Sequence, residues 1–150
     1  MEKRCLIYVL TFESYTESIE DDLKDIRKFL ENKWETKKSN RQCIRTVYFL
    51  KNVIGGKIVG GWVSSKPREN ERGGFLDKTG KWNFHYWIEK NGKIIDITSD
   101  QFGEPKINVL PAKDARYVKN CTAQDMKNDF KFTGEVVDAW IEEYKKINKG

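Results

Sequence analysis

Residues 82–98 read WNFHYWIEKNGKIIDIT, and this stretch decides the fold. Asn91-Gly92 is a strong two-residue turn signal, because both residue types tolerate positive φ, and it separates two runs of β-branched and aromatic residues. We therefore expect an antiparallel hairpin in which Lys90 pairs with Lys93. The expected strands cover residues 82–90 and 93–98.

The register of this hairpin separates two kinds of side chain. Counting back from the turn places Trp87 opposite Asp96 and His85 opposite Thr98. His85 and Asp96 then share a face as diagonal neighbours, roughly 7 to 8 Å apart along the backbone, which long side chains can bridge. Since a carboxylate can orient an imidazole and stabilise its charged form, this face is a candidate catalytic site. The other face is apolar and suited to the core; it carries Phe84, Tyr86, Ile88, Ile95 and Ile97.

A nucleophile would complete such a site, and Cys43 is the first candidate. Apolar residues at helical spacing predict a helix that opens at Cys43 and ends at Gly55-Gly56. A thiolate at a helix N-terminus is stabilised by the helix dipole and by free first-turn amides, which can also bind an oxyanion. Cys121 is the competing candidate, near another predicted helix start, whereas Cys5 lies in an apolar run and is expected to be buried and inert.

Each of these residues also has an ordinary structural explanation. A single histidine on a strand is more often structural than catalytic, and a cysteine at a helix start is often just a small apolar residue. Asp96 could be an outward residue on a half-buried strand. The combination of Cys on a helix, His on a strand and Asp on the adjacent strand is more specific than any one member, and it favours catalysis.

The same residues resemble compact bacterial and phage-type members of the papain-like, transglutaminase-like cysteine hydrolase superfamily. The resemblance covers about residues 40–102: N-R-Q-C entering a helix, then a strand, H-x-W-x-E, a short turn and a hydrophobic D-x-T segment. It implies an α+β fold with a papain-like/transglutaminase-like core, in which the nucleophile helix packs on an antiparallel β-sheet. It also implies a triad of Cys43, His85 and Asp96, and the Asp is nearer the transglutaminase type than the papain type.

The chemistry implied by the resemblance is attack of a thiol on an amide carbonyl. The protein would be a peptidase, a glutamine deamidase or a transglutaminase-like acyl transferase that forms a thioester acyl-enzyme, and its substrate would be a protein or peptide. No cofactor and no metal ion are expected. Gln42 and Gln101 are candidates to stabilise the oxyanion, unless they are ordinary surface amides. Trp62, Trp82 and Trp87 are candidates to line the cleft, unless they belong to the core.

The rest of the chain predicts further elements of one domain over residues 1–150. Helical spacing indicates an N-terminal helix, capped by Ser14 or Thr16, and a C-terminal amphipathic helix. The apolar positions are Ile19, Leu23, Ile26 and Leu30 in the first and Val137, Trp140, Ile141 and Tyr144 in the second. Thr122 with Asp125 predicts the start of a short helix.

Strand and loop signals complete this outline. Residues 57–63 and 115–118 are expected to be strands, and Gly60-Gly61 in the first indicates a bulge or a close backbone approach. Residues 34–42 are expected to form a loop. Residues 64–81 form a long polar loop that is a candidate lid, with a mobile surface loop as the alternative.

The composition excludes several classes of function. The chain has 150 residues, one histidine and three cysteines without a C-x-x-C pair, so two-imidazole chemistry within one chain is excluded and a tetrahedral zinc site is disfavoured. The sparse cysteines also argue against a disulfide framework and favour a cytoplasmic protein. The apolar run at residues 5–10 is too short for a membrane span, and no membrane partner is expected.

The net charge of +5 raises a nucleic-acid alternative. Residues 43–102 hold ten basic and six acidic side chains, but the acidic ones interleave with the basic ones of the 64–81 loop and do not suit a phosphate-tracking stripe. The rival hypothesis is a non-enzymatic module that binds single-stranded nucleic acid by aromatic stacking, although Glu89 and Asp96 would repel the phosphates. A catalytically degenerate protein-interaction domain is the second alternative.

Overall fold

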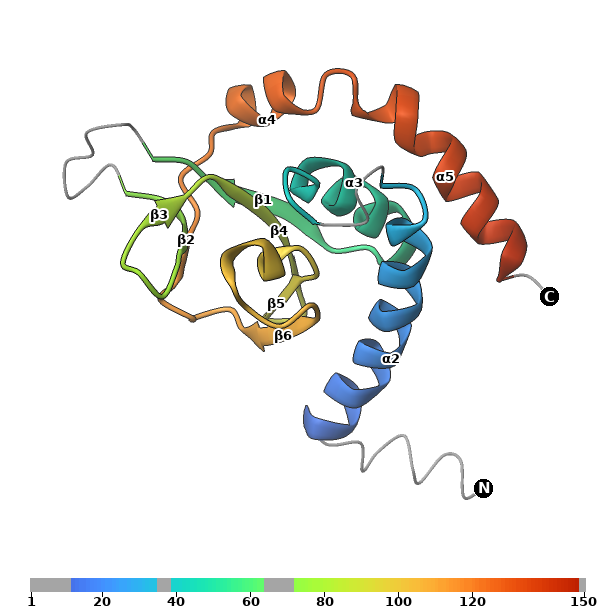
Figure 1. Ribbon diagram of the computed structural model, residues 1–150, viewed down its shortest axis with the longest axis horizontal. Helices are drawn as coiled ribbons and strands as arrows, with labels where there is room; N and C mark the ends of the chain where they lie inside the picture. Colours follow the sequence, from blue (N-terminus) through green and yellow to red (C-terminus); the bar gives the residue numbers. More distant parts are fainter. Residues whose placement is uncertain (1–11, 35–38, 64–71, 149–150) are drawn as a thin grey trace.

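The computed structural model describes residues 12–34, 39–63 and 72–148, with side chains from residue 19 onwards (Figure 1). The described part is an α+β structure with two antiparallel sheets. The helices are α2 (Phe12–Glu31), α3 (Cys43–Ile54), α4 (Ala123–Asp129) and α5 (Thr133–Ile147), with a 3-10 helix η2 (Ser99–Phe102). The strands are β1 (Lys57–Gly61), β2 (Gly74–Leu76), β3 (Trp82–Asn83), β4 (His85–Lys90), β5 (Lys93–Asp96), β6 (Asn108–Pro111) and β7 (Tyr117–Val118).

The predicted hairpin is the centre of the larger sheet, whose strand order is β1-β4-β5-β6. Lys90 pairs with Lys93, which confirms the predicted register. Asn91 and Gly92 have φ values of 52° and 74°, as a two-residue hairpin turn requires. The first strand, however, is not continuous from residue 82. It breaks at Phe84 into β3, which joins the smaller sheet, and β4. The prediction that Phe84 faces the core is therefore wrong: its exposed fraction is 42%.

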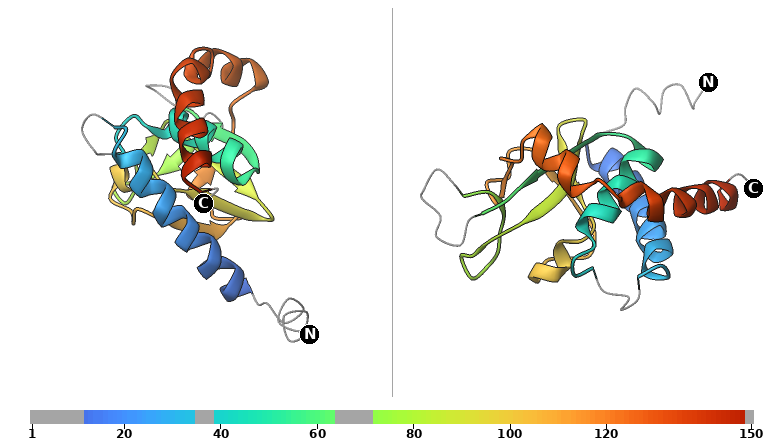
Figure 2. Two further views of the ribbon diagram at one scale, coloured as in Figure 1. Left: turned by 90° about the vertical axis from the view of Figure 1, so that its right-hand side faces the viewer. Right: turned by 90° about the horizontal axis from the view of Figure 1, so that it is seen from above.

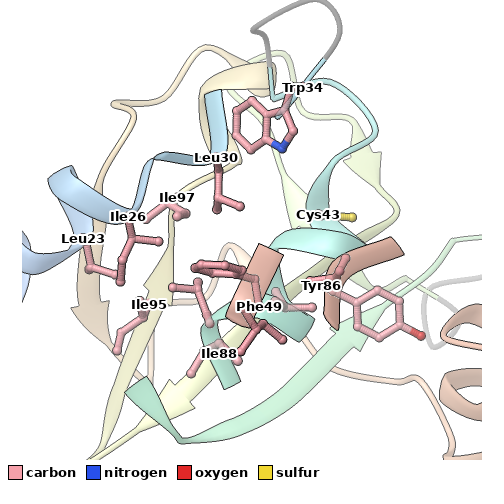
Figure 3. Close-up of a cluster of buried hydrophobic side chains, with 14 of the residues drawn as sticks. Leu23, Ile26, Leu30, Trp34, Cys43, Phe49, Tyr86, Ile88, Ile95 and Ile97 are labelled. Atoms are coloured by element: carbon pink, nitrogen blue, oxygen red, sulfur yellow. The ribbon is translucent and has the colours of Figure 1, made fainter. Parts of the chain in front are cut away.

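One face of the larger sheet is covered by helices (Figures 1 and 2). Helix α3 contacts β4 and also packs against α5, and α2 lies beside them. The predicted apolar stripe of α2 is buried and meets side chains of α3 and the sheet (Figure 3). This core includes Leu23, Ile26, Leu30, Val47, Phe49, Tyr86, Ile88, Ile95 and Ile97. The described part of α2 runs from Phe12 to Glu31, so the two predicted caps, Ser14 and Thr16, lie inside the helix.

The other face of the larger sheet is covered by the smaller sheet, with strand order β3-β2-β7. Phe75 of β2 and Tyr117 of β7 form a second buried cluster with Val59, Trp87 and Ile94. Strand β2 lies inside the segment that was predicted to be one long loop. Its single apolar pair is too short to show a strand period, and it becomes a strand only through its partners. Residues 64–71 of that predicted lid lie outside the described residues.

Two glycines in β1 permit close approaches, as predicted: Gly60 leaves room for the ring of Tyr86 on the neighbouring strand β4, and Gly61 lets β2 of the smaller sheet approach. A Cβ atom on Gly60 would lie 2.2 Å from the Tyr86 ring, and one on Gly61 would lie 2.0 Å from the Gly74 nitrogen. Both distances are shorter than real contacts. β1 itself ends at Gly61, two residues before the predicted end.

The C-terminal predictions are confirmed in outline. Thr122 and Asp125 form a capping box at the start of α4. Helix α5 buries Val137 and Ile141, and β7 covers the second half of the predicted 115–118 strand. Strand β6, which pairs with β5, was not predicted. Among the described residues, no helix is long and apolar enough to cross a membrane.

Candidate active site

The centre of the site is an ion pair between His85 and Asp96. His85 is the first residue of β4 and Asp96 the last residue of β5, so their side chains meet diagonally at one end of the hairpin. The His85 Nε2 atom lies 2.8 Å from the Asp96 Oδ2 atom, which confirms the predicted contact. Both side chains are almost completely buried. The hairpin turn chemistry therefore determines which residues meet here.

Asp96 has further hydrogen-bond donors that hold its carboxylate. The Thr98 backbone N–H donates to Oδ1 at 3.0 Å, and the Tyr117 hydroxyl donates to Oδ2 at 2.8 Å. Burial raises the pKa of Asp96, but the charge of His85 and these hydrogen bonds outweigh burial and lower it below the usual value. The carboxylate is therefore charged and fixed in orientation.

His85 sits inside an aromatic shell. Trp87 stacks on its ring with centroids 6.1 Å apart, and Phe102 contacts it edge-on at 5.2 Å. Burial lowers the pKa of His85, but Asp96 and Cys43 raise it, with a net increase to about 10. The Nδ1 atom is buried and has no hydrogen-bond partner among the described residues. His85 is thus charged near neutral pH and has one ring nitrogen available.

Cys43 is the first residue of α3, and its exposed fraction is 5%. Figure 3 shows its sulfur at the edge of the helix-covered core. It is close enough to His85 to raise the pKa of that histidine. Gln42 is the residue before the helix, and its side chain makes no capping hydrogen bond to the first-turn amides. The first turn of α3 also contains no acidic residue. The first-turn amides are thus left to stabilise a thiolate or an oxyanion.

A cleft of about 290 Å³ reaches Cys43 from the surface. Its lining residues come from the start of α3, from the break between β3 and β4, and from η2. They are Arg41, Cys43, Ile44, Asn83, Phe84, Gln101 and Phe102. The nearly buried thiol therefore faces a space that can admit a substrate.

The competing cysteine lies in different surroundings. Cys121 interacts with Tyr86 and lines a separate pocket beside β1 and α4. Burial raises the pKa of Cys121, and although the Tyr86 hydroxyl lowers it, the net change is upward. Its thiol is therefore less ionised than an ordinary cysteine. Cys5 lies outside the described residues.

The secondary site residues fall in different places. Gln101 lines the cleft, with its Nε2 donating to the Thr98 carbonyl at 2.9 Å. Gln42 has a buried Oε1 without a hydrogen-bond partner among the described residues. Trp87 belongs to the second core behind His85 rather than to the cleft lining, which was the alternative for this residue. Trp62 is 39% exposed and, like Trp82, is not a lining residue of this cleft.

Several residues that support the site were not predicted. The buried Arg27 donates to the Ile97 carbonyl at 2.7 Å and to both carboxylate oxygens of Asp100 at 2.9 Å. Ser39, just before α3, also donates to Asp100 at 2.5 Å. These contacts tie α2 and the entry to α3 to the segment that follows Asp96. Arg27 lies at the spacing of the apolar stripe of α2, which could have identified it; Tyr117 gave no such signal.

The described ranges hold no group of three or more histidine, cysteine, aspartate or glutamate side chains that could bind a metal ion. The carboxylate of Asp96 is instead engaged by groups of the protein itself. Asp96 is held by His85, Thr98 and Tyr117, and a cation would have to displace one of these donors.

Comparison with known proteins identifies one family. No curated protein and no solved structure matches the chain. A family model described as YunG protein matches residues 22–132, which is more than half of the chain. The matched range includes Cys43, His85, Asp96 and Tyr117, and so contains the candidate site. The chain therefore belongs to the YunG protein family.

Proposed function

We propose that this protein is a cysteine hydrolase or acyl transferase acting on amide bonds, with a papain-like/transglutaminase-like core. Cys43 is the nucleophile, His85 is the general base and then the general acid, and Asp96 orients His85. One observation carries the proposal: His85 directs Nε2 at Asp96, its other ring nitrogen is buried, and Cys43 at the start of α3 is close enough to raise the pKa of the imidazole.

The first half of the reaction forms a thioester. His85 first takes the proton of the Cys43 thiol, the thiolate attacks the carbonyl carbon, and the first-turn amides of α3 stabilise the resulting oxyanion. The carbon–nitrogen bond then breaks while the charged His85 gives its proton to the leaving amine. The acyl group is left on the sulfur, and His85 is neutral.

The second half releases the acyl group. A water molecule or an amine enters the cleft, His85 removes its proton, and the oxygen or nitrogen attacks the thioester carbonyl. The carbon–sulfur bond breaks and Cys43 returns as a thiolate beside a charged His85. A backbone amide with water gives peptide hydrolysis, a glutamine side chain with water gives deamidation and ammonia, and a glutamine with an amine gives transamidation.

The electrostatics of the pair support this cycle. A proton on His85 must survive burial if it is to stabilise a thiolate, and the adjacent carboxylate of Asp96 provides the compensating charge. Tyr117 and Thr98 also donate hydrogen bonds to Asp96, so its carboxylate stays charged and the shared proton remains on His85. A charged imidazole beside a cysteine lowers the thiol pKa in general.

The first test is selective alkylation. Iodoacetamide should label Cys43 faster than Cys121 or Cys5 near neutral pH, as followed by peptide mass spectrometry, because a thiolate is the reactive species. Unfolded protein is the control, since all three cysteines should then react alike. Equal labelling of the three cysteines in the folded protein would count heavily against an activated thiol.

The second test identifies the chemistry. Candidate protein mixtures are exposed to wild type and to Cys43→Ala and compared by mass spectrometry. A new backbone cut, a deamidation-scale mass increase or an isopeptide crosslink, present only with wild type, would distinguish the three reactions. The same products with both proteins would mean that Cys43 does not carry the chemistry.

A further inference from the structure

Among the residues that line the cleft at Cys43, Arg41 carries the one charged side chain, and it is a cation. We propose that this cleft takes amide substrates that carry a carboxylate close to the reacting carbonyl, and that Arg41 selects them. The inference rests on the proposed function of Cys43, because it places the carboxylate relative to the nucleophile.

The charge balance of the site gives the first argument. In the thiolate form that the proposed function requires, Cys43 together with a charged His85 and the Asp96 carboxylate carries one net negative charge. An anionic substrate would be repelled by that charge unless a further cation faced the cleft. Arg41 supplies it, two residues before the nucleophile. Among the described residues, its guanidinium makes no hydrogen bond and no ion pair, so it is available to a ligand.

The backbone of Arg41 gives the second argument. Its φ is 62°, in the left-handed region, and the other described non-glycine residue with positive φ is Asn91 of the hairpin turn. Asparagine tolerates this conformation, whereas arginine seldom adopts it. The Arg41 backbone N–H donates to Oε1 of Gln101, another lining residue of the cleft, at 3.4 Å. A strained residue held at a candidate site indicates a functional constraint on its position.

The other lining residues indicate which further group the substrate should carry. Phe84 lies between β3 and β4 and exposes 42% of its surface, and Phe102 and Ile44 also line the cleft. These side chains would contact an apolar part of the substrate. A guanidinium presents two parallel N–H groups that match a carboxylate, so Arg41 suits this anion better than a point charge would.

The experiment compares two alkylating reagents of nearly equal size. Iodoacetate carries a carboxylate where iodoacetamide carries a neutral amide, and both react with Cys43 by displacement of iodide. We expect the ratio of the iodoacetate rate to the iodoacetamide rate at Cys43 to fall at least about fivefold in Arg41→Asn. Asparagine tolerates positive φ, so the midpoint of thermal unfolding should be equal to or higher than that of wild type. Arg41→Gly is the second variant, since glycine also adopts this conformation.

The matched control is Arg45→Gln. Arg45 is exposed, lies two residues after Cys43 and is not a lining residue of the cleft. Its rate ratio should stay within about twofold of wild type. A ratio in Arg41→Asn and Arg41→Gly that matches wild type, or an equal fall in Arg45→Gln, would overturn the inference. The proposed function fails by a different result, which is slow iodoacetamide labelling of Cys43 in wild type itself.

Discussion

The two faces of the larger sheet are both buried, but they are built differently. The face towards α2 and α3 is mainly apolar, and β4 and β5 contribute Ile88 and Ile95 to it. The face towards the smaller sheet carries His85 and Asp96 among aromatic side chains. Apolar side chains are stabilised by burial alone, whereas a buried ion pair must recover a large desolvation cost through hydrogen bonds. The second face is therefore the one whose composition needs a functional explanation.

The largest expected effect is on the second face. His85→Ala should lower the rate of Cys43 alkylation near neutral pH by at least about 100-fold, because no other histidine is present to assist the thiol. The measurement is mass spectrometric labelling with iodoacetamide. Cys121 is the internal control, since its rate should change little. A Cys43 rate within a few-fold of wild type would remove the basis for the proposed triad.

The apolar face should respond in stability rather than in reactivity. Ile95→Ala leaves a cavity in the core and should reduce the free energy of unfolding by about 2 to 5 kcal/mol, measured by urea denaturation. Cys43 should still react rapidly in the folded fraction. Ile147→Ala is the control, because Ile147 is 63% exposed and its truncation should cost little. A reactivity loss in Ile95→Ala as large as in His85→Ala would show that the two faces are not separable.

The ion pair should also make stability depend on pH. The pKa of His85 is raised in the folded state from 6.5 to about 10, so its contribution is complete below pH 6.5 and is lost as the pH rises through about 10. Over this window, the unfolding free energy of wild type relative to His85→Gln should fall by at most about 1.4 kcal/mol per pH unit.

The acid side has the opposite sign. The pKa of Asp96 is lowered in the folded state, so its contribution is present above pH 3.8 and is lost as the pH falls through the lowered value. Denaturant titrations at several pH values measure both effects. A stability difference between wild type and His85→Gln that does not vary from pH 6.5 to 10 would contradict the charged state of His85.

A smaller effect is expected where one donor to the pair is removed. Tyr117→Phe deletes the hydroxyl that donates to Asp96 and should reduce the free energy of unfolding by about 1 to 2 kcal/mol. It should also raise the pKa of Asp96 and move the acid limb of the Cys43 reactivity profile to higher pH. Tyr48→Phe is the matched control, since the Tyr48 hydroxyl makes a similar hydrogen bond to Asp138 on the surface. Equal stability losses in both variants would argue against a special role for the buried hydroxyl.

The smallest effect should come from the exposed end of β4, the strand that begins at His85. Glu89 lies at the far end of β4 from His85 and pairs with Lys119 at 2.8 Å, and the Lys119 side chain is 57% exposed. Glu89→Gln should change the free energy of unfolding by less than about 1 kcal/mol and leave Cys43 reactivity unchanged. Thermal unfolding and alkylation rates test this directly. A large change in either would mean that the polar site extends along the whole strand.

Local signals predicted the parts of the fold that depend on short-range geometry. The Asn91-Gly92 turn set the register, and the register placed His85 diagonal to Asp96. The helical stripe of α2 and the start of α3 at Cys43 also followed from spacing. In each case the interactions that decide the structure lie within a few residues of one another.

The errors have a common cause in long-range packing. Phe84 was assigned to the core by strand alternation, but the chain changes sheets at that residue. The polar face of the hairpin was predicted without its cover, because Phe75 and Tyr117 come from strands of three and two residues that are stable only when paired. Such pairing joins segments far apart in the chain and leaves little periodic pattern to detect.

The sequence by itself determined which residues are candidates for the site and which of them face each other across the hairpin, because turn chemistry and the strand period of two act locally. Only the tertiary structure decided that His85 and Asp96 are buried, that Tyr117 donates to the carboxylate, and that a cleft lined by Arg41 reaches Cys43. These features depend on where the smaller sheet and the start of α3 pack against the larger sheet. That placement results from the packing of distant side chains, and the same packing sets the charge state of the site.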